Sequence, residues 1–405
     1  MMEVRTQVVP TEGPLGRIAP WAFGAAVFAG TFNNFAGGII LVVAFGLALA
    51  VLGQIRIGVL SVCYGAILAL VAVHAVLPNV TPAPVRAEEA ARALCFAATA
   101  AVALMMSDQQ RQQALMVVVA LVIVPIPIYA ALGFFGRIDE SGNLRYTSFF
   151  THPNHLSYVA VILMICVIVA RKKIFGDQRA WFWTVLAGLL LAIGLSESSN
   201  GLVTAAIVLV VFGLTRLRGP LWGAALLVGG IFVVGIALGT PLLDALWLKI
   251  ANMDPTAIMQ GSLSGEFGGH DSSLAWRASY WIAIWREHFS QDLFHILWGY
   301  GGGSTSRGNY VFEFMQKDPH NDVLAFVLDY GLIIGLAVPV LMILPVIGTR
   351  APILLGLALG LPMQTGNIAT EFSVVAVFIL AIAALQVQPS QAMRPDWGAG
   401  SGLAR

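Results

Sequence analysis

The sequence has few charged residues for its length, and this scarcity argues against a soluble globular protein. Of the 405 residues, 11% are Asp, Glu, Lys or Arg, whereas 58% are hydrophobic and the mean hydropathy is +0.83. A soluble domain carries about 25% charged residues. This chain therefore lacks the polar side chains that a water-facing surface needs, and the composition predicts a membrane protein with several spanning helices.

Cysteine is scarce and net charge is close to zero. The three cysteines, Cys63, Cys95 and Cys166, all lie within apolar runs, which argues against a disulfide framework or a metal cluster. The 22 basic and 21 acidic residues leave a net charge of +1, which argues against a nucleic-acid partner. We therefore expect no metal, no other cofactor and no nucleic acid.

Long apolar runs, by contrast, are abundant. A bilayer core of about 30 Å requires roughly 20 apolar residues in a helix. On this criterion the sequence predicts an all-α polytopic membrane protein with about twelve transmembrane helices. The predicted spans are 17–32, 35–53, 57–77, 90–106, 113–134, 155–170, 180–195, 201–215, 220–239, 320–346, 351–365 and 368–388.

No internal repeat is visible, so residues 1–405 are predicted to form one membrane domain. Nine helices fall within 17–239, and three more fall within 320–388. Between them lies a long polar loop, 240–319, that is expected to carry short helices. A cytoplasmic tail is expected over 389–405.

Basic residues in the short loops predict the orientation. One set of alternate loops carries nine Lys and Arg residues and the opposite set carries four, so the first set should face the cytoplasm. Both termini would then be cytoplasmic, and the loop 240–319 would lie outside the cytoplasm. The first set is Arg56, Arg111, Arg171, Lys172, Lys173, Arg179, Arg216, Arg218 and Arg350; the second is Arg86, Arg92, Arg137 and Arg145.

Ionisable residues near lipid are energetically costly and become candidates for function. Here they gather on the side of the protein that is predicted to face away from the cytoplasm. Arg145, His152, Asn154 and His155 surround Pro153, which suits the first position of a helix. A helix N-terminus favours an anion. A polar cap at the membrane interface explains the same residues equally well. For the break Ser196–Asn200, an ordinary capped turn is the favoured interpretation.

An aromatic-rich helix is predicted around Trp276–Arg286. Trp and Tyr prefer the membrane interface, so the helix could lie on lipid with Arg277 and Arg286 touching headgroups. Alternatively, Arg277 could point inward to a phosphate, whose oxygens match the guanidinium fork. The run Gly299–Gly303 lacks the ending of a P-loop, so we expect a sharp turn rather than a nucleotide site.

The segment Asp318–Asp322 precedes a long apolar run. Asp318 is the predicted N-cap, with Pro319 as the first helical residue. His320 would then lie in the first turn, where the helix dipole favours a neutral imidazole that can act as a general base. The alternative is a histidine merely hydrogen-bonded at the interface. Asp329 would lie about 13 Å deeper, on the same helix face as Asp322, and would need a partner.

Taken together, residues 145–335 resemble the O-antigen ligase and polymerase superfamily of bacterial inner-membrane proteins. The resemblance rests on Arg277 with Trp281, the turn Gly299–Gly301, the pair His320–Asn321, and Asp329–Leu332 with Gly335. Upstream, Arg145 followed by Phe149–Asn154 is similar to the family's Arg and Pro-Asn entry to a span. The chain departs from the family at Ser199, where an Arg is usual, and at Asp329, where a Glu is usual.

The resemblance implies a helical fold akin to the lipid-phosphosugar-dependent (GT-C-like) glycosyltransferases, with the active site facing the periplasm. It implies inverting, metal-independent transfer from an undecaprenyl-diphosphate-linked glycan to lipid A–core or to another glycan. His320 would be the base and Arg277 would bind the diphosphate. The predicted substrate-binding residues are Arg145, His152, Asn154, Arg286, Asn321 and Asp329. A transporter or flippase for a lipid-linked or anionic substrate is the rival interpretation, and an envelope scaffold is a third.

Overall fold

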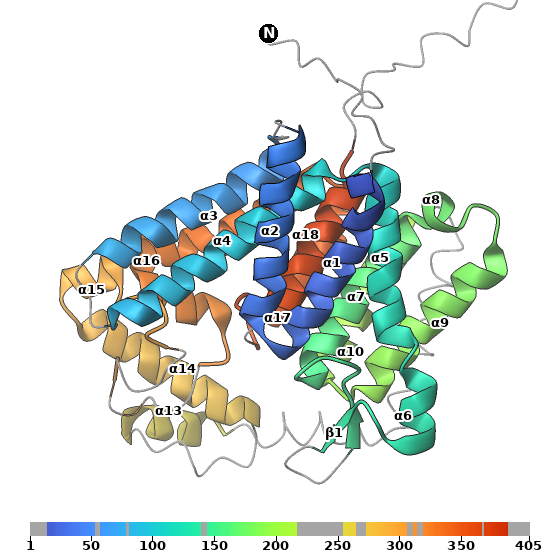
Figure 1. Cartoon of the computed structure of the whole chain (residues 1–405). Coiled ribbons are helices and arrows are strands. Elements are labelled where there is room, and N and C mark those ends of the chain that lie inside the picture. Colours follow the sequence, from blue (N-terminus) through green and yellow to red (C-terminus); the bar gives the residue numbers. More distant parts are fainter. Residues whose placement is uncertain are drawn as a thin grey trace, which may run out of the picture.

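The computed structural model describes residues 14–52, 57–77, 81–138, 144–216, 254–264, 273–305, 311–312, 314, 319–366 and 368–387. Within this part of the chain nearly all regular structure is helical (Figure 1). The predicted all-α class is therefore confirmed, apart from one short antiparallel hairpin that pairs Arg137 with Arg145.

The first half of the chain comprises α1 (Pro14–Phe32), α2 (Asn34–Leu52), α3 (Val59–Val76), α4 (Ala83–Met105), α5 (Asp108–Ile123), α6 (Ile126–Leu132), β1 (Gly136–Ile138), β2 (Leu144–Tyr146), α7 (Pro153–Val169), α8 (Arg171–Phe175), α9 (Arg179–Leu195) and α10 (Ser199–Arg216). The second half comprises α13 (Pro255–Ser264), α14 (Ser273–Ser290), α15 (Leu293–Trp298), α16 (Asp322–Ile343), the short 3₁₀ helix η1 (Leu344–Gly348), α17 (Pro352–Met363) and α18 (Phe372–Leu385).

Most predicted spans coincide with helices, but their lengths vary. Among the described residues, three helical segments are long and apolar enough to cross a membrane: Val59–Val76, Asp108–Leu132 and Asp322–Gly348. Other apolar helices are shorter; α17, with 12 residues, rises only about 18 Å. The twelve-span topology thus stays a prediction, and its span 220–239 lies outside the described residues.

Helix α18 forms the centre of the bundle. Nearly every side chain from Phe372 to Leu385 is buried, and α1, α4, α5 and α7 pack around it (Figure 1). The outward faces of the surrounding helices are also apolar, with Trp21, Val43 and Val73 more than half exposed. Large exposed apolar surfaces mark contact with membrane or protein.

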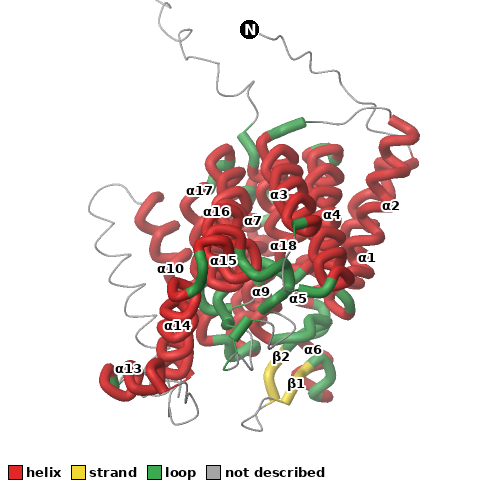
Figure 2. The backbone as a smooth tube through the Cα atoms, turned by 90° about the vertical axis from the view of Figure 1, so that its left-hand side faces the viewer, coloured by secondary structure: helices red, strands yellow, loops and turns green. Residues whose placement is uncertain are grey.

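The two ends of the bundle differ in attached structure. The start of α1 and the end of α18 lie at one end, opposite α13, α14 and the hairpin (Figures 1 and 2). At that first end, Arg111 donates to the carbonyl of Ala383 (2.9 Å), and the backbone N–H of Arg350 donates to Leu385 (2.9 Å). These two residues of the predicted positive-rich loops therefore meet at the end of α18.

Helix α16 differs from its prediction in two ways. It begins at Asp322 with Asn321 as N-cap, whose side chain accepts from the N–H of Leu324 (3.0 Å). The predicted cap at Asp318, with His320 in the first turn, is therefore wrong. The helix also breaks at Gly331 (φ 73°, ψ 175°), where the backbone of Leu297 passes so closely that a Cβ atom would collide with it.

The break at Gly331 separates two packing environments. Before it, Leu324 and Leu328 join an aromatic cluster with Tyr280 and Ile284 of α14. After it, Ile334 and the residues that follow on the same face enter the main core around α18. Helix α14 is therefore packed against the start of α16, rather than only lying on lipid.

Candidate functional site

The starts of four helices meet at the end of the bundle that carries α14. These helices are α7, α10, α16 and α18. The segment 364–371, between α17 and α18, connects them. Its N–H groups at Ile368 and Ala369 both donate to the buried carboxylate of Asp322 (2.9 and 3.1 Å) at the start of α16. Asn200 of α10 donates to the carbonyl of Thr365 (3.4 Å).

Glu371, the N-cap of α18, completes this junction. Its carboxylate lies 3.8 Å from Nδ1 of His155 in the first turn of α7. Helix N-termini carry partial positive charge and unpaired N–H groups. The carboxylates of Asp322 and Glu371 lie among these helix starts and offset part of that positive charge.

His320 is held beside this junction in an unusual backbone conformation. Its φ is 50°, in the left-handed region that residues other than glycine seldom adopt. Trp281 holds Pro319, the residue before His320, because the indole N–H of Trp281 donates to the Pro319 carbonyl (2.6 Å). The Trp276 ring lies 6.3 Å from the imidazole. Such strain tends to persist at functional sites, where the surroundings enforce it.

Arg277 follows Trp276 on α14, so the structure brings the two predicted catalytic residues to the same end of the bundle. Its Nε is buried and has no hydrogen-bond partner among the described residues. Burial lowers the pKa of the guanidinium from its usual value, and Tyr158 of α7 interacts with it electrostatically.

His152 is the N-cap of α7, and Pro153 occupies the first helical position as predicted. Its Nδ1 accepts from the N–H of Asn154 (3.1 Å), which leaves the ring proton of the neutral form on Nε2. Burial, together with a smaller effect of basic neighbours, lowers the pKa of His152 to about 4. His152 is therefore a hydrogen-bond donor at neutral pH rather than a base. Those neighbours are His155, Arg145, Arg137 and His320.

The low pKa of His152 predicts acid sensitivity of the fold. Between its usual value of 6.5 and about 4, the unfolded chain binds more protons than the folded chain, so stability falls as the pH falls. We expect the melting temperature in detergent to drop across this window. His152→Asn keeps an N-cap without titrating, and should show a smaller drop; equal drops in both proteins would contradict the assignment.

Arg145 and Arg137 are directly opposite each other in the hairpin. Like charges at such a position are unfavourable, and both side chains donate to backbone carbonyls nearby. Arg145 Nε donates to Ser196 (2.9 Å), and Arg137 donates to Thr151 (2.8 Å) just before α7. The pair thus adds positive charge next to His152 and anchors the turn that precedes α10.

Three other predicted binding residues have different surroundings. Arg286 is exposed and lies nine residues after Arg277, which places it on the opposite face of α14. Asn321 is the N-cap of α16, and Asn154 lies in the first turn of α7, where its carbonyl accepts from Ser157 (2.8 Å). Asn154 and Asn321 thus have capping or first-turn roles, while Arg286 faces away from the junction.

Asp329 also has a structural role. Its buried carboxylate accepts from Ser304 Oγ (2.7 Å) and from the N–H groups of Thr305 (3.0 Å) and Gly303 (3.0 Å). These bonds hold the glycine-rich turn, which is sharp as predicted, with positive φ at Gly299, Gly301 and Gly303. Asp329 is the partner of this turn, rather than a carboxylate exposed in the middle of a span.

Asp329→Asn should destabilise the protein by about 2–4 kcal/mol, because an amide nitrogen would face donors in a buried site. Thermal unfolding in detergent measures this. Asp292→Asn is the matched control, since Asp292 is an exposed N-cap of α15 and asparagine caps equally well. Equal melting temperatures of Asp329→Asn and the unmodified protein would contradict the role.

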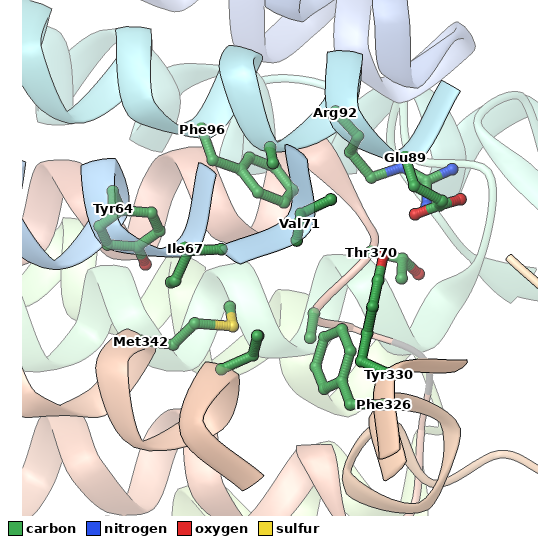
Figure 3. Close-up of a pocket in the computed structure, with 13 residues that line it drawn as sticks. Tyr64, Ile67, Val71, Glu89, Arg92, Phe96, Phe326, Tyr330, Met342 and Thr370 are labelled. Atoms are coloured by element: carbon green, nitrogen blue, oxygen red, sulfur yellow. The ribbon is translucent and has the colours of Figure 1, made fainter. Parts of the chain in front are cut away.

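Figure 3 shows a cavity between α3, α4 and α16 that Ala369 and Thr370 of the segment 364–371 also line. It is lined by apolar side chains such as Phe96 and Met342 between Tyr64 at one end and the Glu89–Arg92 ion pair (2.7 Å) at the other. Its volume of about 30 Å³ suffices for water but not for a lipid chain. We therefore do not assign substrate to it.

Sequence reasoning missed Tyr158 and the bond from Trp281 to the carbonyl of Pro319. Tyr158 stands within an apolar run of the sequence. A buried tyrosine hydroxyl usually needs a hydrogen-bond partner, and this was the signal that could have drawn attention to the residue. Among the described residues, no group of three or more His, Cys, Asp or Glu is arranged to hold a metal ion. No protein family model and no curated protein matches the sequence.

Proposed function

We propose that this protein is a glycosyltransferase of the bacterial inner membrane, of the O-antigen ligase and polymerase type. It would move a saccharide from undecaprenyl diphosphate to a sugar hydroxyl. The observation that carries the proposal is that the ring of Trp276, the residue before Arg277, lies 6.3 Å from the imidazole of His320, next to the start of α16. Three candidate spans and the exposed apolar side chains support a membrane location.

The residues supply the parts of an inverting displacement. His320 accepts the proton of the acceptor hydroxyl, whose oxygen attacks the anomeric carbon from the face opposite the diphosphate. The bond from that carbon to the diphosphate oxygen breaks, and the diphosphate leaves with the electron pair. Arg277 and the helix starts stabilise the negative charge that develops on this leaving group.

Arg145 is proposed to replace the arginine that the family carries in the turn before α10. The chain has Ser199 there, but the Arg145 side chain reaches this turn from the hairpin through its bond to Ser196. The sequence offers two other arginines for this contact: Arg286, which faces away from the junction, and Arg307, which lies outside the described residues. His152, with its proton on Nε2, adds a neutral donor beside Arg145.

The transporter interpretation depended on an available carboxylate within a span. The carboxylate of Asp329 is instead engaged by three donors from residues 303–305. A substrate or coupling ion would have to displace those donors. The site therefore favours an enzyme, and the proposed acceptor is either lipid A–core or a second lipid-linked glycan.

Transfer by the purified protein tests the proposal. The protein in nanodiscs would receive an undecaprenyl-diphosphate glycan and, in separate reactions, each of the two acceptors. Product with lipid A–core indicates a ligase, and a lengthened lipid-linked glycan indicates a polymerase. The same glycan on undecaprenyl monophosphate is the control donor and should give little product. Absence of product with either acceptor, from protein that still binds the donor, would overturn the proposal.

A further inference from the structure

An apolar groove lies on the surface between α16 and α17. Its volume is about 330 Å³, within the range of about 300–1,000 Å³ that small-molecule sites occupy. Among the described residues that line it, Gln364 alone has a polar side chain. Val340 and Ile347 on its wall are 61% and 70% exposed. Both belong to the candidate span Asp322–Gly348, so the groove would open to the lipid of a membrane rather than to water.

One end of the groove lies at the junction of helix starts. Its wall includes Val323, which directly follows Asp322, and Gln364, the first residue of the segment 364–371. The Asp322 carboxylate accepts from the N–H groups of Ile368 and Ala369 in that segment, so this bond joins the two walls beside the junction. The groove therefore extends from the candidate site onto the lipid-facing surface.

The break within α16 creates this shape. In an unbroken helix, Phe326 and Gly335 would lie about 13 Å apart along the axis. Here a Cβ atom on Gly335 would collide with the backbone of Phe326, so the chain bends sharply at Gly331. The bend brings Val323, from the first part of α16, to the same groove as Val340 from the second part.

Hydrocarbon has to fill such a groove in a membrane. Water is absent from the bilayer core, and an empty groove would forfeit dispersion contacts on its walls. Several kinds of lipid chain compete for the space. A chain whose headgroup is bound at the junction has the advantage, because attachment at one site raises its effective concentration at a neighbouring one.

We propose that the groove between α16 and α17 binds the polyprenyl chain of the donor, next to its diphosphate. This inference rests on the proposed function for the identity of the donor. Only the isoprene units nearest the diphosphate would fit, and the remainder of the chain would lie in the bilayer. With its chain in an apolar groove and its diphosphate at the polar junction, the donor is held in one orientation relative to His320.

Gly360→Leu tests the inference because it fills the groove. Gly360 lines it, and a Cβ atom there would lie 3.9 Å from Ile343, at an ordinary contact distance. Leucine also favours a helix more than glycine does, so the melting temperature should not fall. Binding of undecaprenyl diphosphate would be titrated by native mass spectrometry in nanodiscs of phosphatidylethanolamine and phosphatidylglycerol. We expect affinity to fall about tenfold, the effect of losing contact with roughly two methylene groups.

Gly46→Leu is the matched control. Gly46 is an exposed glycine of α2, outside the groove, and a Cβ atom there would have no other atom within 4 Å. The same substitution at this position should leave the affinity for undecaprenyl diphosphate unchanged. Inorganic diphosphate, which carries no chain, should bind Gly360→Leu and the unmodified protein equally.

Unaltered affinity for undecaprenyl diphosphate in Gly360→Leu would overturn the inference. So would photoreactive phosphatidylethanolamine that labels α16 and α17 at the groove equally with and without saturating undecaprenyl diphosphate, because a phospholipid chain would then be the occupant. Absence of transfer by the unmodified protein would refute the proposed function, but a selective binding defect in Gly360→Leu would still support the groove. Conversely, transfer together with unaltered binding in Gly360→Leu would refute the groove alone.

Discussion

Replacement of His320 by asparagine is expected to abolish glycan transfer while leaving donor binding and melting temperature almost unchanged. Asparagine tolerates the left-handed backbone that His320 adopts (φ 50°) better than alanine does. The substitution therefore removes the imidazole without forcing residues 319–322 to move. Loss of a general base lowers the rate about 10²–10⁴-fold, and product formation with saturating donor measures this loss.

His295→Asn is the matched control for this experiment. His295 lies on α15, where it pairs with Asp292 (2.6 Å) outside the junction, so its loss should leave the rate within about twofold. Binding of the donor to His320→Asn separates loss of chemistry from loss of substrate. Normal transfer by His320→Asn would contradict the assignment of His320 as the base.

Composition and hydropathy predicted the helical class and most helix positions, because apolar runs and helix starts are local properties of the sequence. Pro153 begins α7 as expected, and Gly299–Gly303 forms a sharp turn. The same local reasoning failed at the start of α16. Asp318 and Pro319 have the residue types of a cap and first turn, but the helix begins only at Asp322, whose carboxylate accepts bonds from a segment 46 residues later.

At the candidate site, too, local features could be predicted from the sequence and long-range contacts could not. The sequence identified His320 and Arg277 by their residue types and order, but it could not show which side chains face each other. Arg286 shares a helix with Arg277 and points the opposite way, a consequence of nine residues at 3.6 per turn. Asp329 looked like a catalytic or transport carboxylate until its three donors were seen. Long-range partners of this kind leave no mark in a single sequence.

Replacement of Arg277 by alanine is expected to reduce transfer about 10²–10³-fold, because the leaving diphosphate would lose a charged donor when its charge is greatest. Arg277→Lys should recover part of the rate, since an ammonium keeps the charge but not the planar fork. Rates at saturating donor, together with donor affinity, measure the effect. Donor affinity should also fall, by more in Arg277→Ala than in Arg277→Lys.

The control for Arg277 lies on the same helix. Arg286→Ala removes an equal charge from the exposed, opposite face of α14, so net charge and attraction to anionic lipid change alike in both variants. Transfer by Arg286→Ala should stay within about twofold of the unmodified protein, as for most surface substitutions. If Arg286→Ala lost activity and Arg277→Ala kept it, the face of α14 that binds the donor would be the opposite one, and the assignment of Arg277 to the diphosphate would be wrong.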